Sequence, residues 1–197
     1  MARPSAVAER RHQILEATRL VISERGFRDL RIADVAKIAG YSTGTVHYYF
    51  ASKDELLVEA FRFQYEQSVE RRENYLAEDD DPVQRLRKLA SGYLPSSDVT
   101  IESWRVWLEL WVSALRSLPL AAINDVYYGD WRRAVLEAAT EARDAGLLDI
   151  PDLAAFSDAY VAMMDGLAIQ VLIGSAHMTL DRMQATCTAF IDSFLPQ

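Results

Sequence analysis

Residues Ile32 to Phe50 read IADVAKIAGYSTGTVHYYF, a pattern that indicates two short helices joined by a tight turn. The apolar residues of the first half recur at helical spacing on one face, and Gly40 supplies the backbone freedom with which a chain leaves a helix. Ser42 or Thr43 is placed to cap the second helix, in which Val46 is expected to point inward. The pattern is that of a helix-turn-helix, a motif whose second helix lies in the major groove of DNA.

Segments on either side of this motif carry a more specific resemblance. The run from Arg11 to Leu57 contains ILEATRLVISERGF, then VAKIAGYSTGTVHYYF, then SKDELL, and it resembles the DNA-binding domain of the TetR (tetracycline-repressor) family of bacterial transcription regulators. Later, MDGLAIQVL at Met164 to Leu172 resembles the choline-responsive repressor (BetI-like) branch. The resemblance implies an all-α fold of about nine helices. It divides the chain into a three-helix DNA-binding domain, residues 1–52, and a larger helical domain for ligand binding and dimerisation, residues 53–197.

The resemblance also assigns the DNA contacts to particular residues. The DNA-facing positions of the family fall on Thr43, Gly44, Thr45, His47, Tyr48 and Tyr49, and phosphate contacts fall on Arg31 and Lys53. Threonine suits base edges, glycine lets the backbone approach closely, and a tyrosine hydroxyl suits a phosphate oxygen. Core filling is the alternative for Tyr49 and Phe50, and it is the interpretation we prefer for Phe50. The sequence departs from the family at Arg31, usually Ser or Thr, and at His47, more commonly Tyr.

The charged residues are unevenly distributed along the chain, whose formal net charge is -8. Residues 1–53 carry nine Lys or Arg against five Asp or Glu, whereas residues 54–197 carry twelve against twenty-four. Positive charge is therefore concentrated where phosphates would be met, and the acidic remainder keeps the rest of the surface away from DNA. Half of the 197 residues are hydrophobic, which is enough for a substantial core.

Beyond the motif, helical spacing and breaking residues predict further helices. They are expected at residues 11–25, 53–76, 82–95, 101–117, 120–145 and 151–174, with a last helix capped by Thr179. Aromatic and thioether side chains of these helices are candidates for a small-molecule pocket: Tyr65, Trp104, Trp107, Trp111, Tyr128, Trp131, Met163, Met164 and Asp165. A buried carboxylate is costly unless it is paired, so Asp165 needs either a protein donor or a ligand cation. Simple core packing is the alternative for the aromatic residues.

The last two predicted helices are apolar on more sides than one neighbouring layer would cover. Pairing with their copies across a twofold axis would bury these sides, and the family resemblance implies such a four-helix dimer interface. The residues expected at that interface are Leu167, Val171, Leu172, Met183, Phe190 and Phe194.

Catalytic and metal-binding patterns find little support. The three histidines have no ligand spacing, and a lone Cys187 allows neither an intrachain disulfide nor a thiolate cluster, so no cofactor and no metal are expected. Residues 1–11 lack the apolar core of a secretion signal. The most apolar region, residues 154–178, is interrupted by Asp158 and Asp165, which argues against a membrane span. A reducing cytoplasm is the expected compartment.

The expected function is that of a ligand-responsive repressor, not an enzyme. It would bind a palindromic operator in double-stranded DNA as a homodimer, with recognition helices spaced by roughly 34 to 36 Å, and respond to an amphipathic or cationic small molecule. One alternative is a ligand-sensing or partner-docking helical module with a vestigial helix-turn-helix. A second is a helical enzyme that uses the aromatic pocket. An activator would be a variant of the first hypothesis.

Overall fold

The structure is a computed structural model that describes residues 6–76 and 81–196. In these residues the regular secondary structure consists of nine α-helices, which confirms the all-α prediction. Their bounds are α1 (Ala6–Arg25), α2 (Ile32–Ala39), α3 (Thr43–Tyr49), α4 (Lys53–Leu76), α5 (Pro82–Tyr93), α6 (Asp98–Ala114), α7 (Leu118–Asp144), α8 (Leu153–Leu172) and α9 (Leu180–Asp192). The helix α1 begins five residues before the predicted start at Arg11, and α6 is shifted three residues toward the N-terminus.

The helices divide into two compact units. Unit 1 comprises Met1–Ser68 and Glu102–Asn124, and unit 2 comprises Val69–Ile101 and Asp125–Gln197. The division therefore does not follow the chain in order, because most of α6 groups with the N-terminal helices. The domain boundary between residues 52 and 53 remains a prediction from the sequence.

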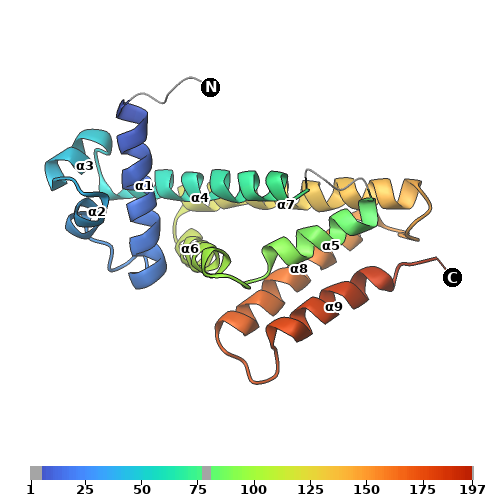
Figure 1. Cartoon of the computed structure of the whole chain (residues 1–197). Coiled ribbons are helices and arrows are strands. Elements are labelled where there is room, and N and C mark those ends of the chain that lie inside the picture. The colour runs from blue at the N-terminus through green and yellow to red at the C-terminus, as the bar shows by residue number, and fades with distance from the viewer. Residues whose placement is uncertain (1–5, 77–80, 197) are drawn as a thin grey trace. The chain divides into compact units, whose positions relative to one another are not determined.

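The helices α2 and α3 of unit 1 form the predicted helix-turn-helix, and α1 packs on α2 (Figure 1). The helix α2 ends at Gly40 in the left-handed conformation, with φ of 75°, and the N–H of Tyr41 donates to the carbonyl of Ala36 at 2.9 Å. The turn then places Ser42 as the cap of α3, where its Oγ accepts the N–H of Thr45 at 3.0 Å. Of the two candidate caps, the structure selects Ser42.

The first part of α4, α6 from Glu102 onward and the start of α7 complete unit 1. Ser52 caps α4 by accepting the N–H of Glu55 at 3.0 Å, and the carboxylate of Glu55 accepts the N–H of Ala51 at 2.7 Å. This is the predicted capping box with its return bond displaced by one residue. In α6 the buried face carries Trp104 and Leu110, whereas Leu115 lies after the helix and is 85% exposed.

Unit 2 is built around contacts of α8 with its neighbours. The hydroxyl of Tyr160 in α8, fully buried, donates to the carbonyl of Leu86 in α5 at 2.7 Å. The helices α8 and α9 lie side by side, and α5 packs on α9 (Figure 1). Thr179 caps α9 by accepting the N–H of Arg182 at 3.2 Å, as the sequence predicts.

Two glycines offer a test of the turn that sets the helix-turn-helix. A Cβ added to Gly40 or to Gly129 would meet no atom within 4 Å, but only Gly40 has a positive φ, whereas Gly129 lies inside α7. We predict that Gly40→Ala lowers the free energy of unfolding by about 1 kcal/mol, because an L residue is strained in the left-handed region. Gly129→Ala should raise it by about 0.5 to 1 kcal/mol. Denaturant titration measures both; equal signs would contradict the assignment of the turn.

Candidate functional site

The helix α3 buries one side and leaves the other free. Val46 and the following Phe50 are buried, so the predicted inward residues are confirmed. The predicted DNA-facing residues lie on the remaining surface: Thr43, Gly44, His47 and Tyr48 are exposed, and Thr45 and Tyr49 are half-buried. Tyr48 is 81% exposed, and its ring stands edge-on to that of Tyr49 at 5.2 Å between centroids. The ring and hydroxyl of Tyr48 are therefore accessible to a partner.

Basic residues flank this exposed face. Arg31 and Lys37 are exposed at the two ends of α2, and the Arg31 side chain makes no capping hydrogen bond. The ammonium of Lys53 lies near the turn after α1, where it donates to the carbonyl of Arg28 at 3.4 Å and lies 5.6 Å from the centroid of the Phe27 ring. The predicted contact of Lys53 with a phosphate remains a proposal.

A second candidate site lies in unit 2, around the half-buried carboxylate of Asp165 in α8. Its two oxygens accept hydrogen bonds from two tyrosines, Tyr93 of α5 at 2.8 Å and Tyr128 of α7 at 2.5 Å. The sequence left open whether a protein donor or a ligand cation is the partner of Asp165, and the structure provides protein donors. A carboxylate has about four lone-pair sites, so two hydrogen bonds leave room for a further partner.

Aromatic rings and guanidinium groups surround this carboxylate. The rings of Tyr93 and Trp131 are stacked, with centroids 4.8 Å apart and an interplanar angle of 16°. The guanidinium of Arg72 lies 5.7 Å from the Trp131 ring, and that of Arg132 lies 5.7 Å from the Tyr128 ring. Both ring systems therefore already attract cations. In the described part of the chain, the indole Nε1–H of Trp131 is buried and donates to no acceptor.

Burial controls the ionisation of this group of residues. Burial raises the pKa of Asp165 above its ordinary value of 3.8, although the hydrogen bonds from Tyr128 and Tyr93 and the charge of Arg132 act in the opposite direction. Burial and the neighbouring carboxylate also raise the pKa of Tyr93 and of Tyr128, so both hydroxyls stay protonated as donors. Because burial disfavours the ionised form of Asp165, a nearby positive charge would stabilise that form.

Comparison with known proteins connects both sites to one family. Residues 82–196 match the family described as BetI-type transcriptional repressor, C-terminal, and residues 14–60 match bacterial regulatory proteins of the tetR family. The chain belongs to the TetR family, with a BetI-type C-terminal region. This membership confirms the resemblance seen in the sequence, including its choline-responsive branch. The family is one of transcriptional regulators and not of enzymes.

Individual relatives of this TetR-family chain agree. The regulator BetI of Yersinia pestis (strain Pestoides F) is 34% identical over 119 residues, which are 59% of this chain and 60% of the relative. The chain thus matches less than two thirds of that relative's length. PksA of Bacillus subtilis (strain 168) is 27% identical over 94% of this chain and 89% of its own. A transcriptional regulator from Saccharomonospora viridis, solved in complex with choline, superposes with a TM-score of 0.91 at 28% identity, over 96% of this chain and 99% of the other.

The predicted pocket residues of this TetR-family chain fall into separate groups. Trp104 and Trp111 contact each other edge-on at 5.8 Å in unit 1, to which Tyr65 and Trp107 also belong. Tyr128, Trp131 and Asp165 gather in unit 2 with Tyr93 and Arg72, and Met163, half-buried in α8, belongs to the same unit. Met164 is fully buried and its Sδ lies 3.2 Å from the Sγ of Cys187, so it belongs to the contact between α8 and α9 and not to the aromatic group.

Two members of the Asp165 group were missed by the sequence interpretation. Neither Tyr93 nor Arg72 is among the pocket residues that the sequence predicts. Arg72 also forms an ion pair with Asp130 at 2.7 Å. The stretch DWRR at residues 130–133 supplies Trp131 and Arg132 to this group, and its mixture of charge and Trp in one helical turn is the signal that the sequence offers.

The residues expected at a dimer interface are only partly available. Met183 has no exposed surface and Leu167 is buried, so the packing of the chain itself removes both from such a contact. Phe190 and Phe194 are half-buried against Phe156, with ring centroids at 5.3 and 5.0 Å. Val171 and Leu172 are half-buried near the end of α8. The apolar periodicity of these helices reflects the core of unit 2 more than the sequence interpretation assumed.

Two kinds of feature are absent from residues 6–76 and 81–196. In these parts of the chain no helix is long and apolar enough to cross a bilayer. Over the same ranges, His, Cys, Asp and Glu side chains form no group of three suited to a metal ion.

The raised pKa of Asp165 has a consequence for stability. Because folding favours the neutral carboxyl, its contribution is fully present below pH 3.8 and is lost as the pH rises through the raised pKa of the folded state. We predict that wild type loses stability relative to Asp165→Asn as the pH rises from 3.8 through the raised pKa of the folded state. Urea unfolding of both proteins over this range measures the difference. A gain for wild type over the same range would show that the carboxylate, and not the acid, is favoured by the fold.

Proposed function

We propose that the protein is a ligand-responsive transcriptional repressor that binds a palindromic operator as a homodimer. The single observation that carries this proposal is the α3 surface, on which Tyr48 and its neighbours remain exposed while Val46 and Phe50 hold the helix in place. Membership of the TetR family supports the proposal, because such an exposed helix after a helix-turn is the element that enters the major groove.

For the effector, we propose a small organic cation that carries a hydrogen-bond acceptor. The carboxylate of Asp165 and the rings of Tyr93, Tyr128 and Trp131 match the groups that recognise a quaternary ammonium ion. The buried Nε1–H of Trp131 would donate to the acceptor. Choline has both features, and the structurally similar Saccharomonospora viridis regulator binds it. A cation entering beside Asp165 would compete with Arg132 for the face of Tyr128.

For the homodimer, we propose that α8 and α9 pair with their copies through exposed small residues. The exposed side of α8 carries Ala155, Ala159, Ala162 and Gly166, which repeat at helical spacing, and Ile173 beyond its end is 72% exposed. Small side chains allow helices to approach closely, and a twofold axis makes such a surface complementary to itself. The half-buried Val171, Leu172, Phe190 and Phe194 would border the contact.

The effector would act by shifting a population. A ligand that binds better to a conformation with another spacing of the recognition helices lowers the fraction that fits successive major grooves. The compartment we propose is the cytoplasm, where DNA and metabolites are both accessible and where Cys187, buried and with its pKa raised to about 11 by that burial, would remain an unreactive thiol.

The operator is testable with variants of α3. We predict that Tyr48→Ala weakens DNA binding about tenfold on every bound sequence. One hydrogen bond to a charged phosphate is worth about 1.5 to 3 kcal/mol, and a tenfold loss lies near the lower end of that range. Tyr48→Phe should behave like Tyr48→Ala if the hydroxyl is the contact. Thr45→Ala should change the order of preference among sequences. Fluorescence anisotropy at two salt concentrations measures the dissociation constants of these variants for DNA.

This experiment also discriminates between the alternatives. A vestigial motif would give neither sequence preference nor salt dependence, and all α3 variants would then bind DNA equally weakly. Such a result would leave a ligand-sensing module as the better account.

The effector site is testable with choline as the probe. We predict that wild type binds choline and that Asp165→Asn weakens binding by at least about tenfold, or about 1.4 kcal/mol, because the carboxylate supplies the opposite charge. Asp181→Asn, which removes an exposed carboxylate at the start of α9, is the matched control and should leave the affinity unchanged. Isothermal titration calorimetry measures all three. Equal loss in both variants would indicate a general charge effect and not a site at Asp165.

A further inference from the structure

The helix α6 belongs to different parts of the molecule by sequence and by packing. Its residues 98–114 fall within the segment that matches the BetI-type C-terminal family. From Glu102 onward, however, the helix groups with α1 to α4 in unit 1. Most of a helix from the BetI-type segment therefore belongs to the same unit as the helix-turn-helix.

Polar contacts of the described residues connect α6 to the N-terminal helices, three of them from Glu102, Ser103 and Glu109. Glu102 forms an ion pair with Arg19 of α1 at 3.0 Å, and Ser103 accepts a hydrogen bond from Gln64 of α4 at 2.5 Å. The third contact differs in kind, because Glu109 accepts the backbone N–H of Phe27 at 2.9 Å. Side-chain partners can adjust their rotamers, but a bond to the backbone fixes the course of the chain. Here it fixes the turn that leads from α1 into α2.

The geometry of this turn fits the carboxylate closely. Gly26 ends α1 in the left-handed region with φ of 77°, and its N–H donates to the carbonyl of Ile22 at 2.9 Å. A Cβ on Gly26 would lie only 3.0 Å from Oε1 of Glu109. The bare glycine thus lets the carboxylate lie directly against the backbone. A hydrogen bond to a charged acceptor is shorter and stronger than one between neutral groups.

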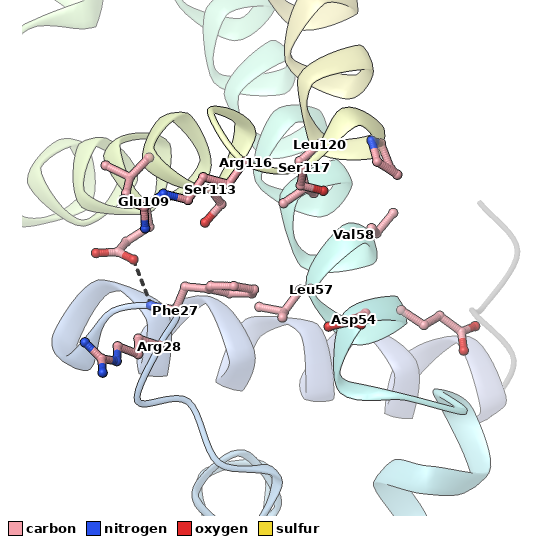
Figure 2. Close-up of a pocket in the computed structure, with 13 residues that line it drawn as sticks. Phe27, Arg28, Asp54, Leu57, Val58, Glu109, Ser113, Arg116, Ser117 and Leu120 are labelled. Carbon is pink, nitrogen blue, oxygen red and sulfur yellow. Dashed lines mark hydrogen bonds between the residues drawn. The ribbon is translucent and has the colours of Figure 1, made fainter.

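Besides the Glu109 bond, the turn is held by the buried side chain of Leu30 and by Lys53, but it also borders open space. A cavity of about 780 Å³ lies between the turn with the start of α4 on one side and the region where α6 meets α7 on the other. Figure 2 shows Phe27 and Leu57 on one wall, Ser117 and Leu120 on the other, and the Glu109 bond at one end of the space. Where the walls do not touch, dispersion contacts cannot set their separation.

We propose that Glu109 is a positioning residue for the DNA-binding helices. Through the N–H of Phe27 it holds the turn at the entrance to α2, and thereby fixes the angle at which α2 and α3 leave α1. The operator-binding consequence rests on the proposed function, whereas the local order of the turn does not.

The test uses three variants of the full chain. Glu109→Ala removes the acceptor, Glu109→Gln keeps a weaker one, and Glu102→Ala is the matched control, because it removes another α6 carboxylate that contacts α1 while Arg19 keeps its bond to Glu16. Amide hydrogen exchange followed by mass spectrometry reports the order of residues 26–31. Operator affinity and the melting temperature are measured on the same preparations.

We expect Glu109→Ala to raise exchange in residues 26–31 by at least tenfold and to lower operator affinity about tenfold, with Glu109→Gln between it and wild type. Glu102→Ala should stay within twofold of wild type in both. Unchanged exchange in Glu109→Ala, or an equal effect of Glu102→Ala, would overturn the proposal. If wild type itself binds no operator, the proposed function fails, and the exchange measurement alone still decides the role of Glu109.

Discussion

A seven-residue helix such as α3 is not stable in water by itself, because nucleation costs more than so few hydrogen bonds return. Its existence depends on the burial of Val46 and Phe50 against the rest of unit 1, supplemented by the Ser42 cap. One consequence is that the apolar side is fully used by the fold. The residues on the opposite side are not needed for the core of unit 1, so they are available for a partner. The proposed DNA-reading surface is thus a direct result of the way in which this short helix is held.

Burial also determines the properties of Asp165, but here burial costs free energy. Burial of the carboxylate opposes its ionisation, and two tyrosine hydroxyls only partly compensate for this cost. A site of this kind is under-satisfied in the absence of a cation, which gives a positively charged ligand a favourable interaction that water cannot match. The arginines over the neighbouring rings show that the surroundings already attract positive charge. Under the proposed function, fold stability and affinity for a cationic ligand would be linked through this one side chain.

The sequence was informative wherever the determining interactions are local. Gly40, the Ser42 cap, the inward Val46 and the Thr179 start of the last helix depend on neighbours within four residues, and propensity rules capture such contacts. The group around Asp165 was only half predicted, because Tyr93 lies 72 residues away and nothing local marks it as a donor. The bond from Phe27 to Glu109 spans 82 residues and was not foreseen. Met183 shows a third limit: periodicity reveals an apolar face but not which apolar neighbour covers it.

The central claim is that the free side of α3, presented twice by a symmetric pair of chains, reads duplex DNA. Selection of bound sequences from a random pool, followed by sequencing, tests it most directly. The account predicts enrichment of an inverted repeat whose half-site centres are about one helical turn apart, roughly 34 to 36 Å. Enrichment of no sequence, or of one without twofold symmetry, would contradict it.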